Sequence, residues 1–394
     1  MAGHATTPLE GLRVLDSADE KGELCGRLLG DLGAEVIRLE PPVGARSRRL
    51  PPFAPGRATS LYFALRNAGK RGITLDFRSP TGAELLHRLL ERVDVWIESE
   101  RPGALAACGL AHPDLLARHP ALVLTSITDF GQDGPYRDWQ GTDMLGFAMG
   151  GLLHRCGRAS RPPVMPPGSL AYDSTGVVAA LATLVALYRR LRSGRGQHLD
   201  VSVQESVANM NDWALPNYSV SQGFQSRDGA GIYALYRCAD GWVRMIVLVT
   251  RHWHALLDWM GRPAELADPK LDQFLERLVR RAEIEPVIER FFADQKKIEI
   301  ALEAQRRGIP VTPLLLPAEV LENEHTRARG TLGRMEIESG LEVSFPTGFL
   351  QIDDRRVGPR ERPPRPGEHN EAIYCGELGL GAEELEALRC QGVV

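Results

Sequence analysis

Apolar and polar positions follow two different periods through the first two hundred residues of the chain. Short apolar runs of strand length occur at residues 12–16, 34–40, 72–77, 94–99, 121–131 and 196–203. Helical spacing of apolar residues separates them, at residues 23–32, 79–93, 112–119 and 173–191. Strands that alternate with helices predict right-handed βαβ units and a mostly parallel sheet covered on both faces.

The pattern changes near residue 217. Residues 217–231 read "NYSVSQGFQSRDGAG", a polar, Gly/Ser-rich stretch that predicts a connection to a second domain. That domain is expected to hold a strand at 241–249 and amphipathic helices up to about residue 307. Extended segments and a Pro/Arg-rich surface stretch follow, and a last helix is expected at residues 383–389.

Composition narrows the function classes. A length of 394 residues is more than one ordinary core needs, so two domains are expected. The net charge of -4 gives no electrostatic argument for nucleic acid. The longest apolar run, residues 176–188, is shorter than the roughly 20 residues that span a bilayer, so no membrane contact is expected. Six scattered cysteines without a CxxC pair indicate reduced thiols, and no secretory signal is visible, so we expect a cytoplasmic protein.

One carboxylate stands out in the middle of the chain. Asp173 lies between a Pro/Gly turn and a long apolar helical run, in "PPGSLAYDSTGVVAALATLVALYRR". Asp is among the best N-cap residues, and the helix is expected to reach about Leu191, with Gly194 and Gly196 ending it. This stretch alone favours a structural cap for Asp173. A chemical role stays open.

Motif absences exclude several enzyme classes. The first strand–helix turn, "LDSADEKGELCG", lacks the GxGxxG pattern of dinucleotide-binding proteins, and no GxxxxGK[ST] is present. No GxSxG elbow supports a serine hydrolase. His252 and His254 have no third ligand at metal-binding spacing. We therefore expect neither a metal nor a tightly bound cofactor.

Two basic clusters flank strand ends. The first is "GARSRR", which includes Arg46 and Arg48, and the second is "GKRGITLDFR", which ends at Arg78. Solvated surface charge is one interpretation. Since open α/β sheets bind ligands at strand ends, a phosphorylated ligand is the other.

A family resemblance runs nearly end to end. It is carried by the stretches "PLEGLRVLD", "LLGDLGAEVIRLEPP", "SLYFALRNAGKRGITLD", "GQDGPYRDWQGTD", "DSTG", "GRGQHLDVSVQES", "ADGWV", "RGIPVTPLL", "RARG" and "RPGEHNEAI". In order and spacing they resemble the CaiB/BaiF family, the class III (formyl-CoA-transferase-like) CoA-transferases.

This resemblance implies a fold and partners. It implies an α/β protein with a Rossmann-like parallel-sheet large domain and a smaller inserted α+β domain. Residues 1–216 and 331–394 would form the large domain, and residues 217–330 the linker and the small domain. Two subunits would interlock, either as a homodimer or as a heterodimer with a paralogous subunit. Acyl-CoA and small carboxylic acids would be the substrates.

The resemblance also implies that Asp173, the aspartate of "DSTG", is the nucleophile. Its carboxylate would attack an acyl-CoA thioester to form a mixed anhydride, and the freed thiolate would then give an aspartyl-CoA thioester. Covalent catalysis of this kind divides one difficult exchange into easier steps. A helix N-terminus would favour the ionised carboxylate, so the capping and catalytic roles are compatible.

Further roles follow position by position from the family. Asp143, after the "GPY" loop, matches an acidic residue that assists at the active site. The implied CoA contacts are Arg48, Leu75, Arg78 and Arg101.

Three positions depart from the family pattern. Ser99 and Glu100 replace its usual Asn-aromatic pair, and Ala107 replaces an arginine. These changes leave the strength of CoA binding open.

Two alternative functions remain. The same family contains α-methylacyl-CoA racemases, whose histidine would stand at Thr142, and without an imidazole a two-base racemisation lacks a partner. The chain could also be a non-catalytic partner subunit of a heteromeric CoA-transferase, although Asp173 argues against that.

Overall fold

The computed structural model describes residues 7–211, 214–223, 227, 234–359 and 361–394. The chain divides into two compact units. The large unit comprises Met1–His154, Met165–Asp212 and Glu324–Val394, and the small unit Arg155–Val164 and Trp213–Asn323. The sequence placed these divisions at 216/217 and 330/331, and it did not assign residues 155–164 to the second domain.

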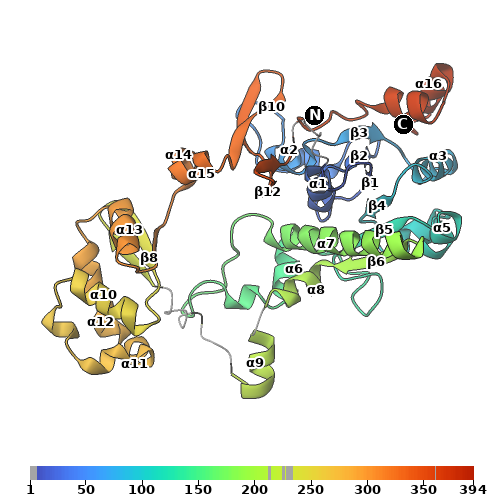
Figure 1. Cartoon of the computed structure of the whole chain (residues 1–394). Helices are drawn as coiled ribbons and strands as arrows, with labels where there is room; N and C mark the ends of the chain where they lie inside the picture. The colour runs from blue at the N-terminus through green and yellow to red at the C-terminus, as the bar shows by residue number, and fades with distance from the viewer. Residues whose placement is uncertain (1–6, 212–213, 224–226, 228–233, 360) are drawn as a thin grey trace. The chain divides into compact units, whose positions relative to one another are not determined.

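A six-stranded parallel sheet organises the large unit (Figure 1). Its strands are β1 (Arg13–Asp16), β2 (Glu35–Glu40), β3 (Arg71–Thr74), β4 (Val95–Glu98), β5 (Val123–Thr128) and β6 (Gln197–Ser202). Their order is β3-β2-β1-β4-β5-β6, and every neighbouring pair is parallel. The order reverses between β1 and β4, which is where such sheets form a ligand-binding crevice. The predicted α/β class with a Rossmann-like sheet is confirmed.

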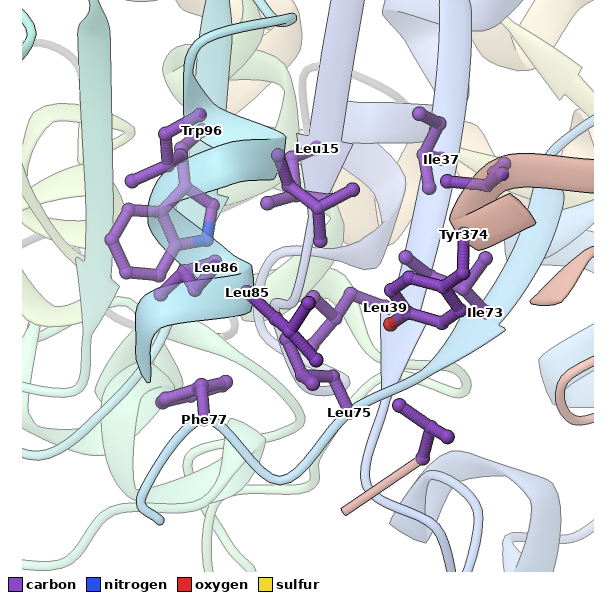
Figure 2. Packing of buried hydrophobic residues seen from close by; sticks show 14 of the residues in the cluster. Leu15, Ile37, Leu39, Ile73, Leu75, Phe77, Leu85, Leu86, Trp96 and Tyr374 are labelled. Atoms are coloured by element: carbon purple, nitrogen blue, oxygen red, sulfur yellow. The ribbon is translucent and has the colours of Figure 1, made fainter. Parts of the chain in front are cut away.

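Helices cover both faces of this sheet because alternate strand residues are apolar toward each side. The helices before the small unit and around it are α1 (Glu23–Asp31), α2 (Leu61–Asn67), α3 (Pro80–Leu90), α4 (Ala104–Ala107), α5 (His112–Arg118), α6 (Asp143–Met149), α7 (Leu170–Ser193) and α8 (Val203–Asn209). On one face, Leu15 and Trp96 pack with Leu86 of α3 (Figure 2). On the other, Val14 packs with residues of α1 and α7.

The end of the chain completes the large unit. It contains α15 (Glu324–Ala328), β10 (Leu332–Glu338), β11 (Leu341–Pro346), β12 (Leu350–Ile352), β13 (Arg355–Val357), the π-helix η7 (Glu371–Glu377) and α16 (Ala382–Cys390). Tyr374 lies in the same core as β1–β3 (Figure 2), and its hydroxyl donates to the Thr74 carbonyl at 2.8 Å. Asn370 Oδ1 accepts from the Thr74 N–H at 2.9 Å. Both ends of the chain therefore build one sheet unit.

The small unit is a separate α+β body. Its strands β7 (Leu235–Cys238), β8 (Gly241–Met245) and β9 (Val311–Pro313) pair antiparallel. Its helices are α9 (Ala214–Ser221), α10 (Thr250–Trp259), α11 (Phe274–Val279), α12 (Arg281–Phe292), α13 (Lys297–Arg306) and α14 (Pro317–Glu322). Helix α9 covers the start of the stretch that the sequence predicts as a connection, and the role of this stretch as a connection stays a prediction. Residues 224–226 and 228–231 of the connection lie outside the described residues.

Helix α7 combines length with apolar composition. By these two measures alone it could cross a membrane, and half of the 18-residue stretch that gives this result is buried within the protein. The helix contacts α1, α6, α8, β5 and β6. Its other face leaves seven apolar side chains exposed: Leu170, Val177, Val178, Leu181, Val185, Tyr188 and Leu191. The six cysteines are all free; a cytoplasmic location stays a prediction.

Candidate active site

Asp173 lies inside the first turn of α7 rather than at its cap. The helix begins at Leu170, its N-cap residue is Ser169, and the Asp173 N–H donates to the Ser169 carbonyl at 2.8 Å. The prediction that Asp173 is the N-cap is therefore wrong. The predicted end is confirmed, because Gly194 terminates the helix in the left-handed conformation with φ of 67°.

Asp143, and not Asp173, accepts a hydrogen bond from the backbone at the start of α7. It is the first residue of α6, and its Oδ1 accepts a hydrogen bond from the Tyr172 N–H at 2.9 Å. Burial raises the pKa of Asp143, and the nearby charge of Asp173 adds to the rise, whereas the backbone groups of Tyr172 and Ala171 oppose it. A carboxyl group with a raised pKa is suited to hold a proton near a second carboxylate. The structure thus brings Asp143 and Asp173 together at the start of α7, a site that we call the Asp173 corner.

The Asp173 carboxylate has one strong partner. Arg66 of α2 donates from Nη2 to Oδ1 at 2.5 Å, and no hydrogen bond reaches Oδ2 from the residues that the structure describes. The Asp173 side chain is 37% exposed, whereas that of Arg66 is 6% exposed. Oδ1 is therefore hydrogen-bonded, and Oδ2 is open in the sense that it has no hydrogen-bond partner among the described residues.

Close helix packing fixes the position of this corner. Gly176 lies in the second turn of α7, where a Cβ atom would stand only 2.9 Å from Cβ of Leu24 on α1. Only glycine lets α7 approach α1 so closely at this point. The glycine of "DSTG" is accordingly required by packing beside the aspartate.

Arg66 was not singled out from the sequence. It stands in the apolar helical run "SLYFALRN", and an arginine at a position that the helix buries was the available signal. The sequence could not show which acid it would meet, because Asp173 is 107 residues away along the chain.

A cleft of about 580 Å³ opens at the carboxyl ends of β1 to β5. Leu75 and Arg78 line it after β3, Arg101 after β4, and Arg46 after β2. Three of the four predicted CoA contacts therefore meet in one cleft, at the point where the strand order reverses. Their role in CoA binding stays a prediction.

Arg48, the fourth predicted CoA contact, does not line this cleft. Its Nε and Nη2 donate to the two oxygens of Glu40 at 2.7 and 2.6 Å, and its guanidinium lies over the Phe63 ring at 3.8 Å. Together with the Pro364 carbonyl at 2.8 Å, these contacts neutralise and position its charge within the protein. It lines a different cavity, of about 530 Å³.

The departures from the family pattern change the cleft directly. Glu100 binds Arg78 through both carboxylate oxygens, at 3.0 and 2.8 Å. Ser99 Oγ accepts from the Asp19 N–H at 2.6 Å and so joins the ends of β1 and β4. Ala107 is an exposed residue of α4. An anionic ligand at Arg78 must therefore compete with Glu100.

Glu98, at the end of β4, is a buried carboxyl group behind the cleft. Burial raises its pKa to about 7, although the Glu100 N–H donates to Oε2 at 2.7 Å. His112 Nε2 lies 4.0 Å from its Oε1. Within the described residues, no group of three or more His, Cys, Asp or Glu side chains could hold a metal ion.

A chain of contacts joins the cleft to the Asp173 corner. Gly141 lines the cleft two residues before Asp143. From the other side, Arg46 of the cleft pairs with Glu20 at 2.9 Å, and the Tyr62 hydroxyl reaches the Glu20 carbonyl at 3.4 Å. Tyr62 in turn stacks on Arg66 at 3.7 Å. These contacts connect residues that line the cleft to the Asp173 corner.

Comparisons with known proteins point in one direction. The family model described as CoA-transferase family III matches residues 9–370. A probable CoA-transferase of Mycobacterium tuberculosis is 34% identical over 88% of this chain, which spans only 44% of that relative. The beta subunit of a succinyl-CoA–L-malate CoA-transferase of Chloroflexus aurantiacus is 30% identical over 100% of both chains.

A solved structure gives the same result for the fold. The crystal structure of a CaiB/BaiF family protein from Brucella suis superposes with a TM-score of 0.83 and 29% sequence identity. It covers 94% of this chain and 99% of the other.

Proposed function

The chain belongs to CoA-transferase family III and is a CoA-transferase, and from that premise we propose that Asp173 is its covalent nucleophile. The observation that carries the proposal is the Asp173 carboxylate itself. One of its oxygens is bound by a buried arginine, the other is open, and a second carboxyl group lies beside it.

The reaction proceeds through two covalent intermediates on Asp173, a mixed anhydride and a thioester with CoA. Its open oxygen attacks the thioester carbonyl of the donor, the C–S bond breaks, and CoA thiolate leaves from a mixed anhydride. The thiolate then attacks the aspartyl carbonyl and releases the donor acid. The acceptor carboxylate reverses both steps and leaves with CoA, so that Asp173 is regenerated.

Asp143 supports this chemistry as a positioning residue. Its carboxyl group binds the backbone at the start of α7 and so fixes the turn that carries Asp173. Its raised pKa lets it hold a proton when the negative charge of the two acids must be reduced.

CoA binds in the cleft at the sheet edge in this proposal. Arg46 and Arg78 are largely exposed there, with 72% and 56% of their side chains accessible, and Arg101 is also exposed. Arginine guanidinium groups suit phosphate geometry. Arg46 takes the role that the sequence assigned to Arg48, whose charge Glu40 already matches.

The donor and acceptor are a small acyl-CoA and a small carboxylic acid. The name of the Chloroflexus relative makes succinyl-CoA the first donor to test and a dicarboxylic acid the first acceptor. A racemase is disfavoured because Thr142, at the position of its histidine, uses its hydroxyl to cap α6 at 3.3 Å from the Leu145 N.

The active species is an intertwined dimer, either of this chain with itself or with a related subunit. The seven exposed apolar side chains along α7 support a partner on that face, and the Chloroflexus relative is named as a beta subunit. Sedimentation at nanomolar concentration tests this. A fully active monomer would refute the dimer, whereas a chain that needs a paralogue for activity supports the heteromeric form.

The transfer assay tests the nucleophile. CoA transfer from succinyl-CoA to a panel of acids is measured for wild type and Asp173→Asn, with Asp114→Asn in the first turn of α5 as the matched control. We expect Asp173→Asn to lose activity on the order of 10⁴-fold or more, and the control to keep it. Near wild-type transfer by Asp173→Asn would remove Asp173 from the mechanism.

A further inference from the structure

Arg66 is a buried cation in an unusual setting. It is 5% exposed, its guanidinium lies over the Tyr62 ring at 3.7 Å, and its Nε is buried without a hydrogen-bond partner among the described residues. The carboxylate that it contacts is that of Asp173. Burying an arginine is costly unless its charge is matched. A purely structural arginine would gain more from a buried acid than from one that is 37% exposed.

We propose that Arg66 is a catalytic residue that stabilises the negative charge on Oδ1 of Asp173 during transfer of CoA. The proposal rests on the covalent role of Asp173. It assigns the two carboxylate oxygens different tasks: Oδ2 forms and breaks bonds, and Oδ1 carries charge under the guanidinium.

The atoms balance as follows. Oδ2 attacks the thioester carbon, and Oδ1 becomes the carbonyl oxygen of the mixed anhydride. When CoA thiolate adds to Cγ, the C=O electron pair moves onto Oδ1, which the Arg66 N–H already contacts. The tetrahedral intermediate collapses, the Cγ–Oδ2 bond breaks, and the donor acid leaves with Oδ2. The aspartyl-CoA thioester retains Oδ1 next to Arg66.

The same contact serves the second half of the reaction. The acceptor carboxylate attacks Cγ of the thioester, and charge again develops on Oδ1 before CoA thiolate leaves. A donor that is already in place when the charge appears stabilises the transition state without reorganisation. The stacking on Tyr62 keeps the guanidinium plane fixed through these steps, since Tyr62 belongs to the same short helix.

The test compares three variants by the rate at which CoA becomes attached to Asp173. Wild type, Arg66→Met and Arg66→Lys are mixed with succinyl-CoA, quenched, and analysed by mass spectrometry of the peptide that contains Asp173. We expect Arg66→Met to form the adduct about 10²- to 10³-fold more slowly, with the KM for succinyl-CoA within about twofold of wild type. Arg66→Lys should recover part of the lost rate because it restores the charge without the planar fork.

Arg27→Met is the matched control. Arg27 is also a buried arginine, pairs with Asp31 at 2.6 Å and donates to the Leu65 carbonyl of α2, but it has no contact with Asp173. The variant Arg27→Met therefore removes a contact with α2, the helix that carries Arg66, without touching the reacting atoms. We expect it to lose thermal stability while keeping the adduct rate within a few-fold of wild type.

The outcomes separate the two proposals. If wild type forms no adduct on Asp173, the covalent mechanism fails and the role of Arg66 falls with it. If wild type forms the adduct and Arg66→Met forms it equally fast, only the role of Arg66 is refuted. If Arg66→Met does not fold, Arg66→Lys decides, because a rate equal to wild type for both adduct formation and turnover would also contradict the proposal.

Discussion

The Asp173 corner and the cleft at the carboxyl ends of β1 to β5 show two different ways of holding charge. In the corner, a buried arginine contacts Asp173, the proposed nucleophile, and the carboxyl group of Asp143 accepts a hydrogen bond from the backbone of α7. In the cleft, the arginines are largely exposed, and Arg78 is bound to Glu100. If the proposed roles hold, the charges of the corner are paired as the reaction needs them before substrate binds, whereas Arg78 in the cleft must exchange Glu100 for the ligand.

In the proposed mechanism, this difference separates the kinetic effects of substitutions. Groups in the corner interact with atoms whose charge changes in the reaction, so their loss should lower kcat. Groups in the cleft contact remote phosphates equally in ground and transition states, so their loss should raise KM. Each prediction below tests that division.

Asp143 should show the largest effect of these. Asp143→Ala removes both the carboxyl group and the acceptor for the Tyr172 N–H, so we expect kcat to fall about 100-fold. Asp143→Asn keeps an acceptor oxygen for the Tyr172 N–H. It should therefore avoid the loss of stability, about 0.5–2 kcal/mol, that removal of a helix cap causes. Steady-state kinetics and thermal melts of both variants separate the two roles. We expect KM to change little. A change confined to KM would indicate that Asp143 contributes to binding in the cleft and not to the reaction at Asp173.

Arg78 should show an intermediate effect. We expect Arg78→Gln to raise the KM for acyl-CoA about tenfold with kcat little changed, because one exposed charge–phosphate contact is worth about 1–2 kcal/mol. The effect should shrink at high salt. If KM is unchanged, the phosphates of CoA lie elsewhere; Arg48→Gln then becomes the next variant to measure.

Glu100 should show a smaller effect of opposite sign. Glu100→Gln frees Arg78 from the acid that it contacts at 2.8 Å, and the KM for acyl-CoA should fall about threefold, as an exposed ion pair is worth about 0.2–1 kcal/mol. The double variant with Arg78→Gln is the control, because Glu100→Gln should then have no further effect. A rise in KM on Glu100→Gln alone would show that Glu100 itself contacts CoA.

Glu98 should affect stability rather than activity. Its pKa in the folded protein is about 7, above the ordinary value of 4.5, so the folded state binds its proton more tightly than the unfolded state. Stability therefore falls as the pH rises from about 4.5 to 7. Glu98→Gln should flatten this part of the melting profile, measured beside His112→Gln because His112 is a titratable neighbour. Identical profiles for wild type and Glu98→Gln would contradict the raised pKa.

The sheet was the easiest part to predict from the sequence. Buried parallel strands such as the one that contains residues 95–97 have continuous apolar runs, and the helices between them have a clear period. Leu75, Arg78 and Arg101 meet because each follows a strand of one parallel sheet. The basic cluster that ends at Arg78 was visible in the local sequence, whereas Leu75 and Arg101 were named through the family resemblance.

The corner was harder because its contacts are remote in sequence. The start of α7 was misplaced since the carboxyl group that satisfies it comes from Asp143, 29 residues away. The local signal for Arg66, an arginine at a position that the helix buries, does not identify the acid that it contacts. Arg48 was matched to a family position, but only the fold could show that Glu40 neutralises it. Tertiary pairing of charges decides which of several arginines remains available for a ligand.

The central claim is that CoA is carried on Asp173, and one measurement tests it most directly. Wild-type protein is mixed with succinyl-CoA without an acceptor acid, digested, and the peptide containing Asp173 is examined by mass spectrometry. We predict a CoA thioester on Asp173 that disappears when an acceptor acid is added. CoA transfer at the normal rate without any adduct, or with an adduct on another residue, would contradict the account.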